Sequence, residues 1–333
     1  MSQPTHQKDK AQAGYPNWKT ATLGGKQFWT DVRYADGWRV QMHSETGHFR
    51  LLNAKSERQG WGNRQHCDQL LNQAIAEGKA STCEGKVVFA LHGLMRTSSA
   101  MKPLVKHLHQ KDGYTVINFQ YASTRKTVGD HAVALKSVVD NLGPNVTEIN
   151  FVGHSLGNIV VRRYLGDTTN KTTGRQGDAR VKRVVMLAPP NQGSRMARIL
   201  KSSILFRTLA GVSGAQLALG WENLEPTLAT PNLEFGIIAG GQETGNNFSN
   251  FILTGPDDFT VSLEETKLVG ARDFLVGPLL HTTIMNQPAV LDATSMFLKH
   301  GYFESEANRK PITADQIKAQ KTDSKAALPR SRN

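Results

Sequence analysis

The chain has 333 residues, of which 38% are hydrophobic and 20% are charged, an ordinary globular composition. This length can bury one large α/β core with additions, or two smaller cores. No apolar run reaches the roughly 18–20 residues that cross a bilayer, and the polar residues 1–14 contain no secretion signal. We therefore expect a cytoplasmic protein; an exported form stays open if the start is trimmed.

Positive charge is concentrated in two regions of a chain whose net charge is +12. Residues 160–210 contain eleven Lys or Arg against Asp167 and Asp178, and the tail from Lys299 contains eight against four acids. Such a surface attracts anionic lipid, acidic polymer or nucleic acid, and a merely solvated basic face is the alternative. Aromatic residues do not alternate with these bases, so we expect no nucleic-acid partner and retain an anionic lipid surface as a candidate.

Cys67 and Cys83 are the only cysteines of the chain. They flank a helical stretch from Asp68 to Lys79, which would hold them about 20 Å apart if straight. A disulfide needs Cα atoms within about 4.4–6.8 Å, so the flanking loops would have to fold back. Two isolated sulfurs disfavour a zinc site, while a disulfide and two free thiols both remain open.

The predicted elements begin with a small antiparallel unit. Residues 1–25 are predicted to be disordered. Alternating residues predict strands over 28–34 and 38–42 around the turn at Asp36 and Gly37, and a third strand over 48–52. A helix is predicted over 65–79. We therefore expect an N-terminal domain at 26–82 that consists of a β-meander and one helix.

From residue 84 strands and helices alternate. Apolar runs predict strands over 86–91, 114–119, 147–152, 181–187, 235–239 and 271–276, with helices over 98–110, 128–142 and after 155. This order predicts the α/β fold class with a doubly wound, mostly parallel sheet. We assign the domain to 84–303, with an inserted lid at about 194–230, and predict a disordered basic tail at 304–333.

The segment Gly153-His154-Ser155-Leu156-Gly157 has the G-x-S-x-G pattern of a nucleophile elbow. In this turn a strand reverses sharply into a helix, and the serine has a strained backbone with its hydroxyl exposed. Glycines at both ends remove the Cβ atoms that would clash in so tight a reversal. Ser155 is therefore the predicted nucleophile; the alternative is a tight turn with an incidental serine.

A serine hydroxyl needs a base to take its proton, and 11 histidines compete for that role. His281 follows the last predicted strand, and loops at the carboxyl ends of parallel strands form the active sites of such sheets. We therefore predict His281 as the base. The main competitors lie in the elbow, at a strand end or on predicted helices: His154, His92, His107, His109 and His131.

The acid that orients the base should fall between them in the chain order Ser…Asp/Glu…His. Asp258, within the segment 255–261, follows a predicted strand and leaves room for one turn or helix and one strand before His281. We predict Asp258 as the acid. Asp257 and Asp273 are alternatives, although Asp273 falls inside a predicted strand. A helix N-cap is the non-catalytic reading of Asp257 or Asp258.

Negative charge develops on the carbonyl oxygen of the substrate during attack, so two backbone N–H groups must converge on it. The amide of Leu156, directly after the nucleophile, is one predicted donor. The loop after the first core strand should supply the other, because Gly93 lets the backbone turn inward. Leu94 is the preferred donor in that loop and Met95 the second choice; an ordinary strand–helix turn is the alternative.

Together these segments resemble the α/β-hydrolase family, and within it the lipases and esterases. The resemblance covers about residues 84–303 and rests on the His92-Gly93-Leu94 turn, the elbow, the Asp258 loop and His281. The segment 187–194 is similar to the P-[H/N]-x-G-[S/T] strand end that opens into a lipase lid. One position departs: Phe259 stands where the family usually has glycine after the acid. Residues 26–82 match no feature of the family.

The insertion at 194–230 is rich in apolar residues, and the resemblance implies cap helices over the site. Their apolar side chains would shape an acyl pocket, and Arg195, Arg198, Lys201 and Arg207 would make its rim basic. Helices that simply pack on the domain are the alternative. A long apolar lid favours lipid-like esters.

The sequence thus predicts a serine hydrolase that cleaves carboxylic esters through an acyl-enzyme. Ser155 attacks, His281 takes its proton, and Asp258 orients the imidazole. We expect no metal or organic cofactor, because no Gly-rich phosphate loop or metal-ligand cluster is present in the sequence. Thioesterases, amidases and acyltransferases share this fold, and a catalytically silent binding module is a further alternative. The sequence indicates no oligomeric state.

Overall fold

The computed structural model describes residues 25–193, 204–241 and 263–316. These residues form two sheets, one of four antiparallel strands and one of six parallel strands. The predicted α/β class, with a doubly wound parallel sheet preceded by an antiparallel meander, is confirmed. The predicted disordered segment at 1–25 lies almost wholly outside the described residues.

The N-terminal sheet has the strand order β1-β2-β3-β4. Its elements are η1 (Lys26–Phe28), β1 (Trp29–Ala35), β2 (Trp38–His43), β3 (Phe49–Leu52) and β4 (Arg58–Gly62), followed by α1 (Arg64–Ala76). Asp36 and Gly37 form the predicted hairpin turn with φ of 39° and 84°. One face of the sheet packs on α1 through the buried Cys67, Leu71 and Ala74.

The parallel sheet has the order β10-β9-β8-β7-β5-β6. Its strands are β5 (Gly85–Leu91), β6 (Thr115–Phe119), β7 (Val146–His154), β8 (Val181–Leu187), β9 (Glu234–Gly240) and β10 (Asp273–Gly277). The connecting elements are η2 (Ser98–Met101), α2 (Lys102–Asp112), α3 (Val128–Asp140), α4 (Leu156–Asp167), α6 (Ile204–Ala218), α7 (Trp221–Leu224), η3 (Glu225–Thr227), α8 (Leu263–Thr266), η4 (Ile284–Asn286) and α9 (Pro288–His300).

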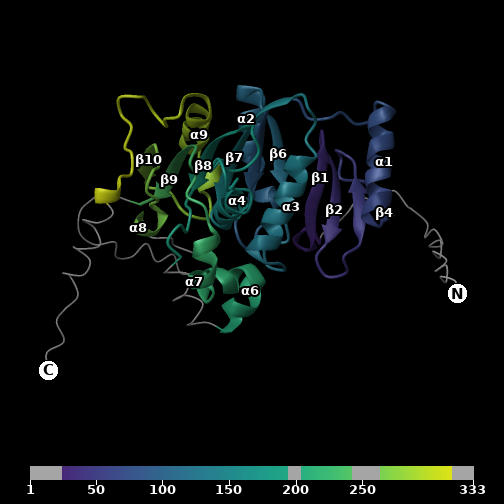
Figure 1. The fold of residues 1–333 in the computed structure, drawn as a ribbon, viewed down its shortest axis with the longest axis horizontal. Coiled ribbons are helices and arrows are strands. Elements are labelled where there is room, and N and C mark those ends of the chain that lie inside the picture. The colour runs from purple at the N-terminus through teal and green to yellow at the C-terminus, as the bar shows by residue number, and fades with distance from the viewer. Residues whose placement is uncertain (1–24, 194–203, 242–262, 317–333) are drawn as a thin grey trace.

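Helices cover both faces of the parallel sheet. α3 and α4 lie on one face and α2 and α9 on the other, while the N-terminal sheet stands beside α3 (Figure 1). Successive residues of β5 enter opposite cores, with Val87 and Phe89 in one and Val88 and Ala90 in the other. A strand that is buried on both faces needs apolar residues at every position, which explains the unbroken apolar run.

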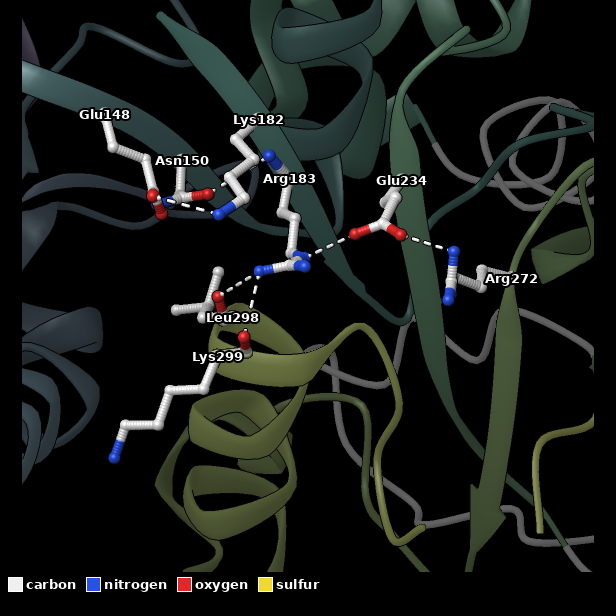
Figure 2. A network of polar contacts seen from close by, with 8 residues as sticks. All are labelled: Glu148, Asn150, Lys182, Arg183, Glu234, Arg272, Leu298 and Lys299. Carbon is white, nitrogen blue, oxygen red and sulfur yellow. Dashed lines mark hydrogen bonds and ion pairs between the residues drawn. The ribbon is translucent and has the colours of Figure 1, made fainter. Parts of the chain in front are cut away.

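A polar network links the end of α9 to the amino-terminal ends of β8 and β9 in the parallel sheet (Figure 2). Arg183 Nε donates to Glu234 Oε2 at 2.6 Å, and its Nη1 donates to the carbonyl oxygens of Leu298 at 2.9 Å and Lys299 at 3.1 Å. These carbonyls belong to the last turn of the helix, where no intrahelical donor is available. Arg183 therefore caps α9 from the neighbouring sheet.

Part of the basic region 160–210 is paired within the described residues. Four of its bases form ion pairs: Arg163 with Asp167, Arg180 with Asp178, Lys182 with Glu148, and Arg183 with Glu234. Arg162 is buried. These contacts reduce the charge that the region presents to an anionic surface.

The structure also bears on the two cysteines and on the predicted disordered tail. Cys67 and Cys83 are both free and buried, so the thiol alternative holds. Disorder was expected from residue 304, but Ile312 is buried, and its backbone N–H and C=O bond to Ala271 and Gly270, each at 3.0 Å. Burial of one apolar side chain in the core cluster that also contains Ala271 explains this difference. Residues 317–333 of the predicted tail lie outside the described residues.

Candidate active site

The strand–elbow–helix order predicted around Ser155 is present. β7 ends at His154, α4 begins at Leu156, and Ser155 between them has φ 51° and ψ −118°. A positive φ is rare and strained for a residue with a side chain, and such strain concentrates at functional sites. The amide of Ser155 donates to the carbonyl oxygen of Leu187 at 3.0 Å, which holds the strained turn against β8.

The two glycines of the motif are required by close packing. A Cβ atom at Gly153 would lie 2.4 Å from Asn158 Oδ1, and one at Gly157 would lie 2.5 Å from the carbonyl oxygen of Leu91. Neither separation leaves room for a side chain. The turn is therefore pressed against both its own helix and β5.

Asn158 is a functional residue that the sequence analysis missed. It is fully buried, and its Nδ2 donates to the carbonyl oxygens of Ser155 at 3.2 Å and Leu187 at 3.1 Å. This side chain fastens the elbow to the end of β8. The sequence signal that could have indicated it is an asparagine three residues after the elbow serine, in the first turn of the predicted helix.

The predicted oxyanion loop lies directly on the elbow. A Cβ atom at Gly93 would lie 2.9 Å from His154 Nδ1 and 3.3 Å from Ser155 Cβ, so only glycine fits. No described residue accepts a hydrogen bond from the amide of Leu94 or Met95. Leu156 begins α4, so its amide has no intrahelical acceptor. The loop that carries Leu94 and the amide of Leu156 therefore flank Ser155, with these N–H groups available.

His281 follows β10 and lies against the elbow. His154 Nε2 is 2.9 Å from the carbonyl oxygen of His281, and the two ring centroids are 5.0 Å apart. Burial, and then the positive charge of Arg96, lower the pKa of His281 to about 4. Its imidazole is therefore neutral at pH 7, the state that a general base requires. Its Nδ1 atom is buried with no partner among the described residues.

Of the three candidate acids, the structure describes only Asp273. Asp257 and Asp258 lie in 242–262, outside the described residues. Asp273 begins β10, at the end of the strand opposite His281, and its carboxylate accepts from the amides of Phe274 at 2.9 Å, Phe303 at 2.7 Å and Lys310 at 2.9 Å. Three backbone donors occupy this carboxylate, so Asp273 has a structural role and does not face His281.

The described part of the lid rests on the loop after β6. Val212 N donates to Thr124 O at 2.9 Å, and Ser213 Oγ donates to Lys126 O at 2.8 Å. Leu217 and Ala218 are buried in the main core, whereas Val212 is 43% exposed. These helical residues therefore pack on the domain. Arg195, Arg198 and Lys201 of the predicted basic rim lie outside the described residues.

The described residues contain neither a metal-binding cluster nor a membrane-spanning helix. No group of three or more His, Cys, Asp or Glu side chains there is arranged to hold a metal ion. No helix there has both the length and the apolar character to pass through a bilayer.

Comparison with known proteins identifies one family. Residues 50–228, more than half of the chain, match a family model described as a domain of unknown function (DUF7379). The matched segment contains the elbow and the Leu94 loop and ends before His281. No curated protein matches the chain in sequence.

Several solved structures are similar in fold. A mature lipase of Bacillus licheniformis is 18% identical with a TM-score of 0.46, and the alignment covers 66% of this chain and 92% of that chain. An esterase of Pyrococcus furiosus is 17% identical with a TM-score of 0.43, over 87% of this chain and 100% of that chain. The parallel sheet and the strand–elbow–helix turn are those that the resemblance to α/β-hydrolases predicts.

Proposed function

The chain belongs to the family described as a domain of unknown function (DUF7379), and we propose that it is a serine hydrolase that cleaves carboxylic esters through an acyl-enzyme. One observation carries the proposal: Ser155 has a strained backbone with φ 51° and lies beside a loop in which the amides of Leu94 and Met95 have no acceptor among the described residues. A nucleophile and unoccupied N–H donors on the same side of a turn are what acyl transfer requires.

The proposed roles follow from the positions of the groups. Ser155 Oγ attacks the ester carbonyl while His281 takes its proton, and His281 then protonates the leaving alkoxide. A water molecule, activated by the same imidazole, hydrolyses the acyl-enzyme and restores the serine. The amides of Leu94 and Leu156 stabilise the oxyanion in both steps, which is usually the largest single catalytic contribution.

Asp258 is the proposed acid. The buried Nδ1 of His281, which has no partner among the described residues, supports a carboxylate partner from the segment 242–262. A carboxylate there would hold the imidazole in the tautomer with Nε2 free to take the serine proton. Asp257 is the second candidate, and the contacts of Asp273 argue against it.

The proposed substrate is an ester with an apolar acyl group. The lid insertion supports this class, because α6 lies against Leu94: a Cβ atom at Gly214 would lie 3.3 Å from Leu94 Cδ2. An apolar helix beside the oxyanion loop would lie along the acyl chain of a bound ester. Thioesters and amides pass through the same intermediate and remain the alternative substrates within this proposal.

A fluorophosphonate probe tests the nucleophile directly. We expect covalent labelling of the folded protein at Ser155, loss of labelling in Ser155→Ala, and unchanged labelling in the control Ser305→Ala. Absence of labelling in the folded wild-type protein would refute the proposal and leave the silent binding module as the remaining reading.

Substrate class is tested with p-nitrophenyl esters graded in acyl length, assayed beside matched thioesters and anilides. We expect the highest kcat/KM for an ester longer than acetate. If thioesters or anilides are turned over faster than every ester, the substrate class is wrong, and the proposed role of Ser155 as nucleophile still holds.

A further inference from the structure

Leu94 is held in place by the side chain of His92, which precedes the turn. His92 is fully buried, and its Nδ1 lies 2.9 Å from the carbonyl oxygen of Gly93. The Arg96 amide donates to the same oxygen at 3.3 Å. Because a peptide unit is planar, the carbonyl of Gly93 and the N–H of Leu94 point in opposite directions. Fixing this carbonyl therefore fixes the direction of the Leu94 N–H.

Tyr121 in turn fixes His92. It is fully buried, its hydroxyl donates to the carbonyl oxygen of His92, and its ring stacks on the imidazole at a centroid distance of 4.2 Å. The Tyr121 amide lies 3.5 Å from His92 Nε2. Nε2 thus accepts and Nδ1 carries the hydrogen, which is the tautomer that donates to Gly93. Burial lowers the pKa of His92 to about 4, so the ring stays neutral.

The N-terminal sheet anchors Tyr121 through its neighbour Gln120. The Asp31 amide donates to the carbonyl oxygen of Gln120, and the Gln120 amide donates to Asp31 Oδ2, both at 2.8 Å. Gln41 Nε2 donates to the other carboxylate oxygen at 2.7 Å. Asp31 is fully buried, so this contact is rigid and shielded from water.

We propose that His92 and Tyr121 are positioning residues that aim the Leu94 amide at the oxyanion, and that Asp31 of the N-terminal sheet anchors this pair. The inference rests on the proposed hydrolase function and assigns a role to Asp31, which lies in the segment 26–82 that matches no feature of the hydrolase family. Every link is a contact between buried groups, running from Asp31 through Gln120, Tyr121 and His92 to Gly93.

Tyr121→Phe tests the hydroxyl and retains the ring. We expect kcat to fall about tenfold with KM within about twofold, because a misdirected amide weakens transition-state binding more than substrate binding. Tyr164→Phe is the matched control: Tyr164 is also buried, but its hydroxyl accepts from the Asp178 amide far from Ser155. Equal losses of kcat in both variants, or none in Tyr121→Phe, would overturn the proposal.

Rescue by asparagine tests the role of the imidazole. The side-chain nitrogen of Asn is as many bonds from Cα as His Nδ1, so His92→Asn retains a donor to Gly93 whereas His92→Leu does not. We expect His92→Asn to keep kcat within about threefold and His92→Leu to lose more than about tenfold. Equal activity of the two variants would contradict the donor role.

Hydrogen exchange gives a readout that does not depend on catalysis. In Tyr121→Phe and His92→Leu, the amide of Arg96, which donates to the carbonyl oxygen of Gly93, should exchange faster than in wild type, whereas Tyr164→Phe should leave its exchange unchanged. Unchanged exchange in all three variants would refute the positioning role. If the wild-type protein neither hydrolyses esters nor reacts with a fluorophosphonate, the proposed function fails, and this exchange measurement still decides the contact.

Discussion

Nε2 of His154 lies 2.9 Å from the carbonyl oxygen of His281, a bond that joins residues 127 positions apart in the chain. Burial holds the pKa of His154 well below its ordinary value, so the ring is neutral and Nε2 must carry its hydrogen to donate. The side chain inside the elbow therefore fixes the backbone of the loop that carries the predicted base.

Loss of this bond should reduce turnover without removing any reacting group. We expect His154→Phe, which keeps a flat ring but has no donor, to lower kcat about tenfold, because a displaced base transfers a proton poorly. His131→Phe is the control, since His131 is buried, neither ring nitrogen has a hydrogen-bond partner among the described residues, and a Phe ring can retain the contact with the Tyr121 ring. It should keep kcat and raise the free energy of unfolding by about 1 kcal/mol. Full activity in His154→Phe would contradict the role of the bond.

Substitution of the catalytic acid should lower activity, whereas substitution of a structural aspartate should lower stability. Asp258→Asn should lower kcat by roughly 10³–10⁴-fold at an unchanged melting temperature, because the imidazole would favour the wrong tautomer. Asp273→Asn should instead lower the free energy of unfolding by about 2 kcal/mol, because its carboxylate accepts three backbone N–H groups. Ester hydrolysis and urea unfolding of both variants, with Asp257→Asn alongside, test this. A larger activity loss in Asp257→Asn would move the assignment of the acid.

Buried neutral histidines predict acid sensitivity. Burial lowers the pKa of His92 to about 4 and that of His131 to about 3, from an ordinary value of 6.5. Between pH 6.5 and 4 the unfolded chain binds protons that the folded protein does not, so stability must fall as the pH falls through this window. A pKa lowered from 6.5 to about 4 corresponds to about 3 kcal/mol for one histidine.

Urea unfolding at several pH values between 4.5 and 7 measures this dependence. The free energy of unfolding should decrease steadily as the pH falls below 6.5, and His131→Phe should reduce the slope because one titrating group is removed. A free energy that stays constant across this window would show that these side chains bind protons equally in the folded and unfolded states, which contradicts the lowered pKa values.

Local sequence patterns predict much of the fold. The strand predicted at 181–187 coincides with β8, because residues 184–187 form the apolar run of a strand that is buried on both faces. The elbow was also predictable, since its geometry tolerates few residue types. β4 was not predicted, because Gly60 and Gly62 disfavour strands and its structure comes from pairing with β3. α9 was also missed, although Pro288 at its start is typical of a helix N-terminus.

The candidate site was predictable only in part, for a physical reason. Ser155, Leu94 and Leu156 lie within or beside short motifs, so their positions follow from local backbone geometry. The contacts of Asn158, His92 and Tyr121 depend on which segments the fold brings together. A buried tyrosine that bonds to a carbonyl across two strands leaves no local pattern in the sequence.

Arg183 should be important for stability and unimportant for catalysis. Its guanidinium joins Glu234 to the last carbonyls of α9 (Figure 2). Arg183→Met should lower the free energy of unfolding by about 3 kcal/mol, because it leaves these carbonyls without a donor and removes one partner of Glu234. Lys136→Met, which removes an exposed pair with Asp140, should cost less than about 0.5 kcal/mol. A similar melting temperature for both variants would contradict the capping role.

Helix α6 of the predicted lid depends on a kink at Gly211, where φ is 61° and ψ is −153°. A Cβ atom there would lie 1.9 Å from the carbonyl oxygen of Thr124, which accepts from the Val212 amide. Gly211→Ala should therefore force α6 away from the loop after β6 and from Leu94. We expect kcat/KM for long-chain p-nitrophenyl esters to fall at least about fivefold more than for the acetate, because only a long acyl chain would reach the helix.

Gly220→Ala is the matched control within the same lid. A Cβ atom at Gly220 would lie 3.3 Å from Gln216, and its φ of −105° is ordinary for a residue with a side chain. This variant should therefore hydrolyse esters of every length at close to the wild-type rate. An equal loss on short and long esters in Gly211→Ala would indicate that α6 supports the oxyanion loop and does not contact the acyl chain.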